Sequence, residues 1–305
     1  MTPSATSPLA RPRDTKGPKV WLDYDQAGLD DAYDQTVWTP LMADLQARRA
    51  ATSEAARARI GQPQRFAYGP APVEGLDVFP ARAPHAPVFV FIHGGGWRQG
   101  DAKGYAFAAE MFRDAGVAYV VPDFAPVTDF GGDLVPMAAQ VRRAIAFAYK
   151  NAAQFGGDPA RFYVAGHSSG AHLAAVALTA DWETEFGIPS TFIAGGMLMS
   201  GMYDMKPVRL SKRSDYVTFT DANEDALSPQ RHLDRLRAPL VVSVGTKESP
   251  EFIRQARDFV AAVKAAGKTA ELVVAPEFNH LEVVESLGNP YGPNGRAALA
   301  LMGLK

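Results

Sequence analysis

The amino-acid sequence predicts an α/β fold in which a mostly parallel sheet is covered by helices on both faces. From residue 88 onward, short and continuously apolar runs alternate with longer segments of helical periodicity. Strands that are apolar along their whole length are typical of a sheet that is buried on both faces. The chain has 305 residues and shows no internal repeat, which favours one large domain.

The segment before residue 88 is less regular. Residues 1–19 are rich in Pro, Ser and Thr, which predicts a disordered leader, and residues 20–305 are expected to form the single domain. Residues 20–60 are expected to be helical. Two β-like fragments at 65–68 and 75–79 are broken by Gly and Pro, and we expect them to add an antiparallel N-terminal edge to the sheet.

The alternating part of the chain predicts the rest of the sheet. We expect strands at residues 88–92, 117–121, 162–165, 192–199, 240–244 and 271–274. Helical segments are expected at residues 105–115, 134–155, 169–181 and 251–266, with a further helical tail at the C-terminus.

Composition excludes several classes of protein. The 31 Lys and Arg residues nearly balance the 33 Asp and Glu residues, so no basic nucleic-acid-binding face is indicated. The chain has no cysteine, which excludes disulfide scaffolds and thiolate metal sites. No apolar run approaches the roughly 18 residues of a membrane-spanning helix, and the first residues lack the apolar core of a secretory signal. We therefore expect a cytoplasmic protein that acts on a small molecule; no membrane or nucleic-acid partner is expected, and a homodimer is left open.

The strongest motif is the pentapeptide Gly166-His167-Ser168-Ser169-Gly170. An apolar strand precedes it and a helical segment follows it, which is the context of a nucleophilic serine on a sharp strand-to-helix turn. The flanking glycines are needed because a Cβ atom would collide with neighbouring backbone. The helix N-terminus also favours the negative charge that develops during attack. The alternative is that a serine merely caps the helix.

A second motif, His93-Gly94-Gly95-Gly96-Trp97, directly follows an apolar strand. Three consecutive glycines cost conformational entropy, and an oxyanion hole supplies a reason because bare backbone can aim N–H groups at a carbonyl oxygen. The alternatives are a flexible loop or a phosphate-binding loop. The chain carries no dinucleotide-binding or P-loop pattern that would favour the phosphate reading.

A nucleophilic serine needs a base, which follows the serine in the chain order of such folds. Three histidines follow Ser168. His172 lies in the helix after the serine and is expected to pack, and His232 is expected at the surface. His280 follows the last predicted strand, from which it can reach a nucleophile at the carboxyl ends of the strands. We predict His280 as the base.

The acid that orients this base has three candidates. Glu248 lies in the loop after the predicted strand at 240–244, at the same edge of the sheet. Asp204 follows the preceding strand and is its main rival. Glu251 lies in the first turn of a helix, where a carboxylate is favoured by the helix dipole alone.

Together these residues resemble the α/β-hydrolase superfamily and, more narrowly, its kynurenine formamidase (arylformamidase)-like and carboxylesterase branch. The resemblance extends from about residue 20 to residue 291. It rests on the two glycine motifs and on four further segments, namely Ser200-Gly201-Met202-Tyr203-Asp204, Ala226-Leu227-Ser228-Pro229, Glu248-Ser249-Pro250-Glu251-Phe252 and Asn279-His280-Leu281-Glu282.

The resemblance implies the α/β-hydrolase fold, with Ser168 as nucleophile, Glu248 as acid and His280 as base. It also implies that the oxyanion is bound by the backbone N–H groups of Gly95, Gly96 and Ser169. The chain departs from the formamidases that share the Ser-Pro-Glu-Phe segment, because these usually carry Asp where Glu248 stands. No metal or other cofactor is implied.

The substrate pocket is harder to predict. Trp97, Tyr203 and Phe278 lie near the carboxyl edge of the predicted strands and are proposed as pocket residues, with core packing as the alternative. Arg98 and Lys103 could pair with a substrate carboxylate, although a surface position is the favoured interpretation. The N-terminal helical segment and the insert at 201–236 are expected to form a small roof over the pocket.

These expectations lead to a serine hydrolase that cleaves a small carboxylic ester through an acyl-enzyme. An arylformamidase acting on N-formyl aromatic amines such as N-formylkynurenine is the alternative. A non-catalytic ligand-binding protein on the same scaffold, a lyase and an acyltransferase are further alternatives, because a fold does not fix its chemistry.

Overall fold

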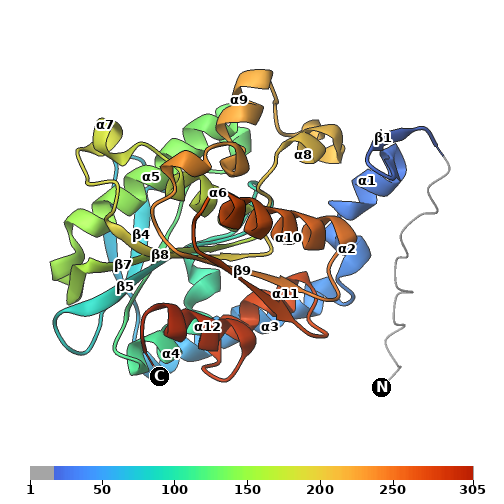
Figure 1. Ribbon diagram of the computed structural model, residues 1–305. Coiled ribbons are helices and arrows are strands. Elements are labelled where there is room, and N and C mark those ends of the chain that lie inside the picture. The colour runs from blue at the N-terminus through green and yellow to red at the C-terminus, as the bar shows by residue number, and fades with distance from the viewer. Residues whose placement is uncertain (1–16, 305) are drawn as a thin grey trace, which may run out of the picture.

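The computed structural model describes residues 17–304 and contains an eight-stranded sheet with helices on both faces (Figure 1). The strand order is β10-β9-β8-β7-β5-β6-β4-β3, in which β4 is antiparallel to β6 and to β3, while the strands from β10 to β6 are mutually parallel. The predicted α/β fold with an antiparallel N-terminal edge is therefore confirmed. The strands are β3 (Gln64–Ala67), β4 (Gly75–Phe79), β5 (Ala86–Ile92), β6 (Ala118–Pro122), β7 (Gly157–His167), β8 (Ile193–Met199), β9 (Leu240–Gly245) and β10 (Ala270–Ala275).

Several of the helices cover the two faces of this sheet. The helices are α1 (Gln26–Ala32), α2 (Gln35–Trp38), α3 (Met42–Ile60), α4 (Ala109–Asp114), α5 (Leu134–Lys150), α6 (Ser169–Leu178), α7 (Trp182–Phe186), α8 (Lys206–Leu210), α9 (Asp221–Ala226), α10 (Pro250–Ala265), α11 (His280–Glu285) and α12 (Pro293–Leu301). Short 3₁₀ turns extend several of them, including one at Ala102–Ala108 before α4 and one at Ala152–Phe155 after α5.

The N-terminal part differs from the prediction. The proposed leader lies largely outside the described residues, but Lys19 already belongs to a strand. Residues 20–60 do not begin as a helix, because β1 (Lys19–Trp21) and β2 (Tyr24–Asp25) first form a two-stranded antiparallel hairpin. Strands of two or three residues are too short to produce a recognisable alternation of apolar and polar side chains.

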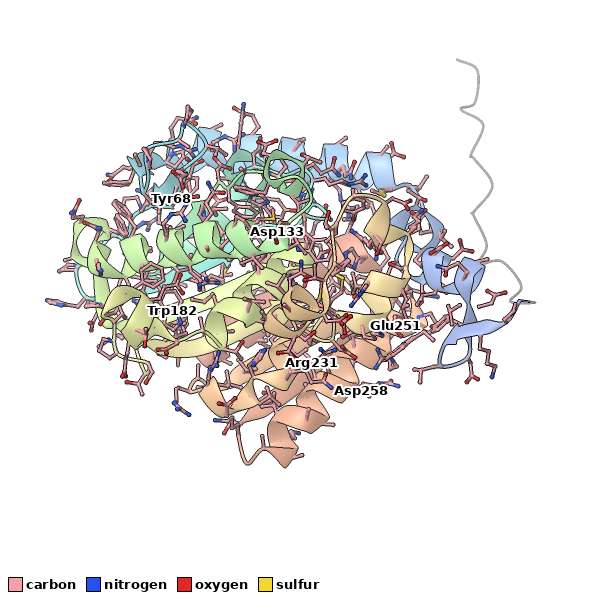
Figure 2. All side chains as sticks on the ribbon, turned by 90° about the horizontal axis from the view of Figure 1, so that it is seen from above. Tyr68, Asp133, Trp182, Arg231, Glu251 and Asp258 are labelled. Atoms are coloured by element: carbon pink, nitrogen blue, oxygen red, sulfur yellow. The ribbon has the colours of Figure 1, made fainter. Side chains whose placement is uncertain are left out.

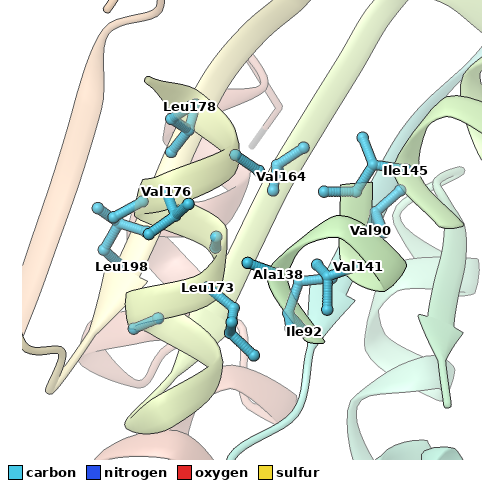
Figure 3. Close-up of a cluster of buried hydrophobic side chains, with 14 of the residues drawn as sticks. Val90, Ile92, Ala138, Val141, Ile145, Val164, Leu173, Val176, Leu178 and Leu198 are labelled. Atoms are coloured by element: carbon cyan, nitrogen blue, oxygen red, sulfur yellow. The ribbon is translucent and has the colours of Figure 1, made fainter. Parts of the chain in front are cut away.

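Alternate strand residues supply two hydrophobic cores. Val88, Val90 and Ile92 of β5 face one side, whereas Phe89 and Phe91 face the other, as the two-residue period of a strand requires. On the first side the strands pack against α5, α6 and α10, and Figure 3 shows part of this cluster. On the second side they pack against α4, α11 and α12. The sheet is thus buried on both faces, as its apolar strands predict.

The parallel strands place four loops at one edge of the sheet. The glycine loop follows β5, Ser168 follows β7, Glu248 follows β9 and His280 follows β10. Because the carboxyl ends of parallel strands meet at the same edge, residues far apart in sequence are gathered there.

Candidate active site

Ser168 connects β7 to α6 in a strained conformation, with φ 56° and ψ −125°. A Cβ atom on Gly166 would lie 2.3 Å from the carbonyl oxygen of Gly170. A Cβ atom on Gly170 would lie 2.1 Å from the carbonyl oxygen of Ile92. Only glycine fits these two positions, so the turn holds Ser168 at the N-terminus of α6 in a conformation that an ordinary loop would not keep.

Ser168, His280 and Glu248 form a continuous hydrogen-bonded chain. The Oγ atom of Ser168 lies 2.8 Å from Nε2 of His280, and Nδ1 of His280 lies 2.6 Å from Oε2 of Glu248. All three residues are at most 6% exposed. Since a carboxylate only accepts, Nδ1 carries the proton and Nε2 is left to accept the serine hydrogen. This is the tautomer that a general base needs.

The carboxylate of Glu248 is fixed by two further donors. Its Oε1 atom accepts hydrogen bonds from the Ser200 hydroxyl and from the backbone N–H of Gly245, each at 2.7 Å. Three donors thus hold a buried carboxylate, which satisfies its lone pairs without a cationic side chain. The longer side chain of glutamate is accommodated within the loop that follows β9.

The imidazole of His280 is also held from several sides. Asn279 caps α11 by accepting from the backbone N–H groups of Leu281 and Glu282, which fixes the backbone at His280. The Phe252 ring packs edge-on against the imidazole, with ring centroids 4.9 Å apart. The Nε2 of His167 lies 2.9 Å from the carbonyl oxygen of His280 and donates to it.

The two rival acids have other partners. Asp204 accepts from the backbone N–H of Lys206 at 3.1 Å and from Arg231 at 3.2 Å. Glu251 is fully buried and binds Arg254 and the Tyr33 hydroxyl. Arg231 and Glu251 are labelled in Figure 2. The structure therefore brings Glu248, and neither Asp204 nor Glu251, into contact with His280.

The glycine loop is built against the serine turn. A Cβ atom on Gly94 would lie 3.2 Å from Cβ of Ser168, and one on Gly95 would lie 1.7 Å from the carbonyl oxygen of Gln99. Gly95 and Gly96 have φ of 135° and 63°. These conformations and close approaches require glycine, so the three glycines form a loop of defined conformation and not a flexible one.

Three backbone N–H groups beside Ser168 are available to a bound oxygen atom. They are the groups of Gly95, Gly96 and Ser169, and within residues 17–304 no hydrogen bond occupies them. Ser169 is the first residue of α6, where helices lack an internal partner for their N–H groups. Their location matches the predicted oxyanion hole, and their role remains a proposal.

Two other histidines near the site are buried and neutral. Burial, followed by the charges of His280 and Arg49, holds the pKa of His167 well below its usual range. Burial lowers the pKa of His172 to about 4, although Nε2 of this ring binds the carbonyl oxygen of Leu227. His172 is fully buried and packs edge-on against Trp97, as the sequence predicts for it.

A cavity of about 780 Å³ opens in front of the serine. The glycine loop, Ser168 and His280 form its floor, and residues 33–36, 42–49 and 212–216 line the opposite side. Helix α1, just before residues 33–36, is joined to the end of α8 and to Lys212 by hydrogen bonds from Lys212 N–H to Asp30 at 2.7 Å and from Gln26 to the carbonyl oxygen of Leu210 at 2.8 Å. They belong to the two parts of the chain that the sequence proposes as a roof; that they act as a roof stays a prediction.

The three predicted pocket residues do not line this cavity, and their assignment was wrong. Trp97 and Tyr203 are at most 1% exposed, and Tyr203 stacks on Phe259 at 4.1 Å. Phe278 lines a separate, smaller cavity. The side chains of Trp97 and Tyr203 turn into the core, and that of Phe278 faces the smaller cavity.

The cavity instead uses residues that the sequence did not single out. They include Tyr33, Arg49, Arg213 and Tyr216, and Tyr105 lines the cavity as well. Arg98 is exposed, as the favoured surface interpretation predicts, and it also lines the rim of the cavity. No motif marked Arg49 or Arg213, because they lie in segments whose position over the sheet depends on tertiary packing.

Residues 17–304 form neither a metal-binding cluster nor a membrane-spanning helix. No group of three or more His, Cys, Asp or Glu side chains there is arranged to hold a metal ion. No helix there is long and apolar enough to cross a membrane.

Part of the chain, including this site, is similar to known proteins. The family model BD-FAE matches residues 76–194, which contain the glycine loop and Ser168. The chain is 29% identical to kynurenine formamidase of Danio rerio over 88% of this chain and 93% of the relative. It is also 29% identical to esterase LipC of Mycobacterium tuberculosis over 75% of this chain and 59% of that protein.

A solved structure agrees with these relatives. The crystal structure of a thioesterase candidate from Silicibacter superimposes with a TM-score of 0.79 at 26% identity, covering 90% of this chain and 98% of the other. The chain therefore has the α/β-hydrolase fold and is similar in sequence to esterases and formamidases.

Proposed function

We propose that this protein is a serine hydrolase that cleaves small carboxylic esters through an acyl-enzyme, with Ser168, His280 and Glu248 as its catalytic residues. One observation carries the proposal. The Ser168 hydroxyl and the His280–Glu248 pair are in hydrogen-bond contact at the floor of a cavity that is large enough for a small molecule.

In the first step Ser168 attacks the ester carbonyl while Nε2 of His280 takes its proton. Glu248 holds the imidazole in place and stabilises the imidazolium that forms. The tetrahedral oxyanion is bound by the N–H groups of Gly95, Gly96 and Ser169, and the loss of one such donor costs about 3–4 kcal/mol of transition-state stabilisation. His280 then gives its proton to the leaving alcohol.

In the second step water attacks the acyl-enzyme. His280 removes a proton from the water, the acyl–oxygen bond to Ser168 breaks, and the serine recovers its hydrogen from the imidazolium. The products are a free carboxylic acid and an alcohol. The buried and fixed Glu248 carboxylate supports the same imidazole in both steps.

Cleavage of an N-formyl aromatic amine is the second candidate. It is favoured by the similarity to the kynurenine formamidase of Danio rerio, which extends over nearly the whole of both chains. The same catalytic residues would attack the formyl carbon and release formate and an amine. The ester reaction is placed first because an alcohol is a better leaving group than an amine.

The test combines covalent labelling with a substrate panel. We expect a fluorophosphonate probe to label wild-type protein and not Ser168→Ala, since only an activated serine reacts. The two reactions are then ranked by comparing kcat/KM for short- and medium-chain aryl esters with kcat/KM for N-formyl aromatic amines. Turnover by Ser168→Ala, or a folded wild-type protein that the probe does not label, would overturn the proposal. A cytoplasmic location remains a prediction. Whether the protein forms a homodimer remains open.

A further inference from the structure

The cavity in front of Ser168 is richer in basic than in acidic side chains. Its described lining contains Arg49, Arg98, Lys212 and Arg213, against Asp34 and Asp215. Lys212 already forms an ion pair with Asp34. This imbalance is local, because the whole chain has a formal net charge of −2.

Each of the three cavity arginines lies over an aromatic ring. The guanidinium carbon of Arg49 is 4.7 Å from the ring centre of Tyr105, that of Arg98 is 4.0 Å from Tyr216, and that of Arg213 is 5.6 Å from Trp97. A ring that contacts the face of a guanidinium restricts its plane and leaves the N–H donors at its edge free for hydrogen bonds.

None of these three arginines forms an ion pair with a carboxylate within residues 17–304. Arg213 is 8% exposed and donates to neutral acceptors, the Tyr33 carbonyl oxygen at 3.0 Å and the Tyr216 hydroxyl at 2.6 Å. Burying a cation without a counter-charge costs folding free energy. We therefore expect Arg213 to contribute to binding an anionic group.

The arginines lie close to the reaction centre. A Cβ atom on Gly96 would be 2.8 Å from a terminal nitrogen of Arg213, which places this charge directly beside the glycine loop. Tyr105, under Arg49, stacks in turn on His93, the first residue of the same loop, with ring centres 5.7 Å apart. A substrate whose carbonyl occupies this loop therefore lies among guanidinium groups.

We infer that the substrate carries a carboxylate besides the bond that is cleaved, and that Arg49 and Arg98 bind this carboxylate. The inference rests on the proposed function and adds the substrate class. A planar guanidinium matches a carboxylate with two parallel hydrogen bonds, which a neutral group of the same size cannot form as strongly. Arg213 is already engaged with Tyr33 and Tyr216, and its charge adds to the attraction.

The test compares charged and uncharged esters of equal size. In one pair the carboxylate is on the leaving group, as meta-carboxyphenyl acetate against meta-carbamoylphenyl acetate. In the other it is on the acyl group, as the para-nitrophenyl monoester of adipic acid against that of adipic acid monoamide. We expect kcat/KM of wild-type protein to favour the charged member of at least one pair by roughly tenfold, the effect of one hydrogen bond to a charged group.

The same ratio is measured in variants. Arg49→Gln and Arg98→Gln should each reduce the preference severalfold, their combination should abolish it, and Arg49→Lys should restore part of it. Arg48→Gln is the matched control, since Arg48 neighbours Arg49 on α3, binds Glu285 and does not line this cavity. The inference would be overturned if the ratio of kcat/KM for charged over uncharged ester were close to 1 in both wild-type pairs. It would also be overturned if the double variant kept the wild-type ratio.

Binding separates this inference from the proposed function. Titration calorimetry with Ser168→Ala protein requires no turnover, and the charged acetate should bind roughly tenfold more tightly than its carbamoyl analogue. Preferential binding without any wild-type hydrolysis would refute the proposed function alone. Hydrolysis without preferential binding would refute the carboxylate site alone.

Discussion

The hydroxyl of Ser200 lies 2.7 Å from Oε1 of Glu248, the carboxylate oxygen that does not bind His280. One oxygen of Glu248 is therefore fixed by Ser200 while the other binds the imidazole. Ser200 itself is fully buried and has φ 54°, so the turn after β8 aims this hydroxyl at the carboxylate. We propose Ser200 as a positioning residue, which would act on the reaction only through Glu248.

Ser200→Ala should lower kcat by about tenfold with little change in KM, since a hydrogen bond to a charged group contributes about 1.5–3 kcal/mol. Ser243→Ala is the control, because the Ser243 hydroxyl is buried in β9 without a hydrogen-bond partner among the described residues. Steady-state kinetics on an aryl ester measure both variants. Equal kcat values for wild type and Ser200→Ala would argue against this role.

Glu248→Gln should reduce kcat by about 10³–10⁴-fold, because a neutral amide no longer fixes the tautomer or stabilises the imidazolium. Asp204→Asn should stay within a few fold of wild type, since Asp204 binds Arg231 and not His280. Glu248→Asp should fall between them, because the shorter side chain draws the carboxylate away from the imidazole. A larger loss in Asp204→Asn than in Glu248→Gln would reverse the assignment of the acid.

Gly95→Ala should reduce kcat by at least 10²-fold, the effect of losing an oxyanion donor. The reason is steric, since the added Cβ atom would lie 1.7 Å from the carbonyl oxygen of Gln99 and displace the loop. Gly187→Ala provides the matched control. Gly187 also has a positive φ, 64°, but a Cβ atom there meets nothing within 4 Å, so the variant should lose about 1 kcal/mol of stability and no activity. Circular dichroism checks that both variants fold.

Stability should fall as the pH drops below neutrality, in part through His172. Its pKa is about 4 in the folded protein, against 6.5 for an unperturbed histidine, because burial disfavours the charged ring. The unfolded chain therefore binds the proton more tightly, and the contribution that is complete above pH 6.5 is lost between pH 6.5 and pH 4, by about 3 kcal/mol.

The comparison is with His172→Gln, which lacks this titration. Urea unfolding at several pH values should show a smaller loss of unfolding free energy on acidification in the variant than in wild type. If the unfolding free energy fell equally with pH in both proteins, His172 would not be the group that titrates. Wild-type protein should be the more stable of the two at neutral pH, where the ring donates to the Leu227 carbonyl oxygen.

The location of Ser168, His280 and Glu248 could be predicted because it depends on backbone topology. Loops that follow parallel strands meet at one edge, and the flanking glycines indicated the turn at the serine. The choice between Glu248 and Asp204 could not be made in the same way, because both follow strands at that edge. It depends on Arg231, which pairs with Asp204, and this contact crosses 27 residues of the chain.

Side-chain direction accounts for the failed predictions. Trp97 has φ 63°, which turns its ring away from the cavity and toward His172. Tyr203 stacks on Phe259 of α10, a contact that strand position does not indicate. Arg49 was not singled out because α3 precedes the whole parallel sheet, and its packing near the glycine loop arises only in the folded chain.

The close approach of Gly170 to Ile92 and His93 limits how this enzyme can be redesigned. A Cβ atom at Gly170 would meet their carbonyl oxygens at 2.1 and 2.4 Å, so the turn that holds Ser168 packs against the glycine loop directly through main-chain atoms. The opposite wall consists of separate segments joined mainly through side chains, such as Lys212 and Asp34. New acyl or alcohol preferences should therefore be engineered in that wall, where the sequence can diversify while the reacting atoms keep their places.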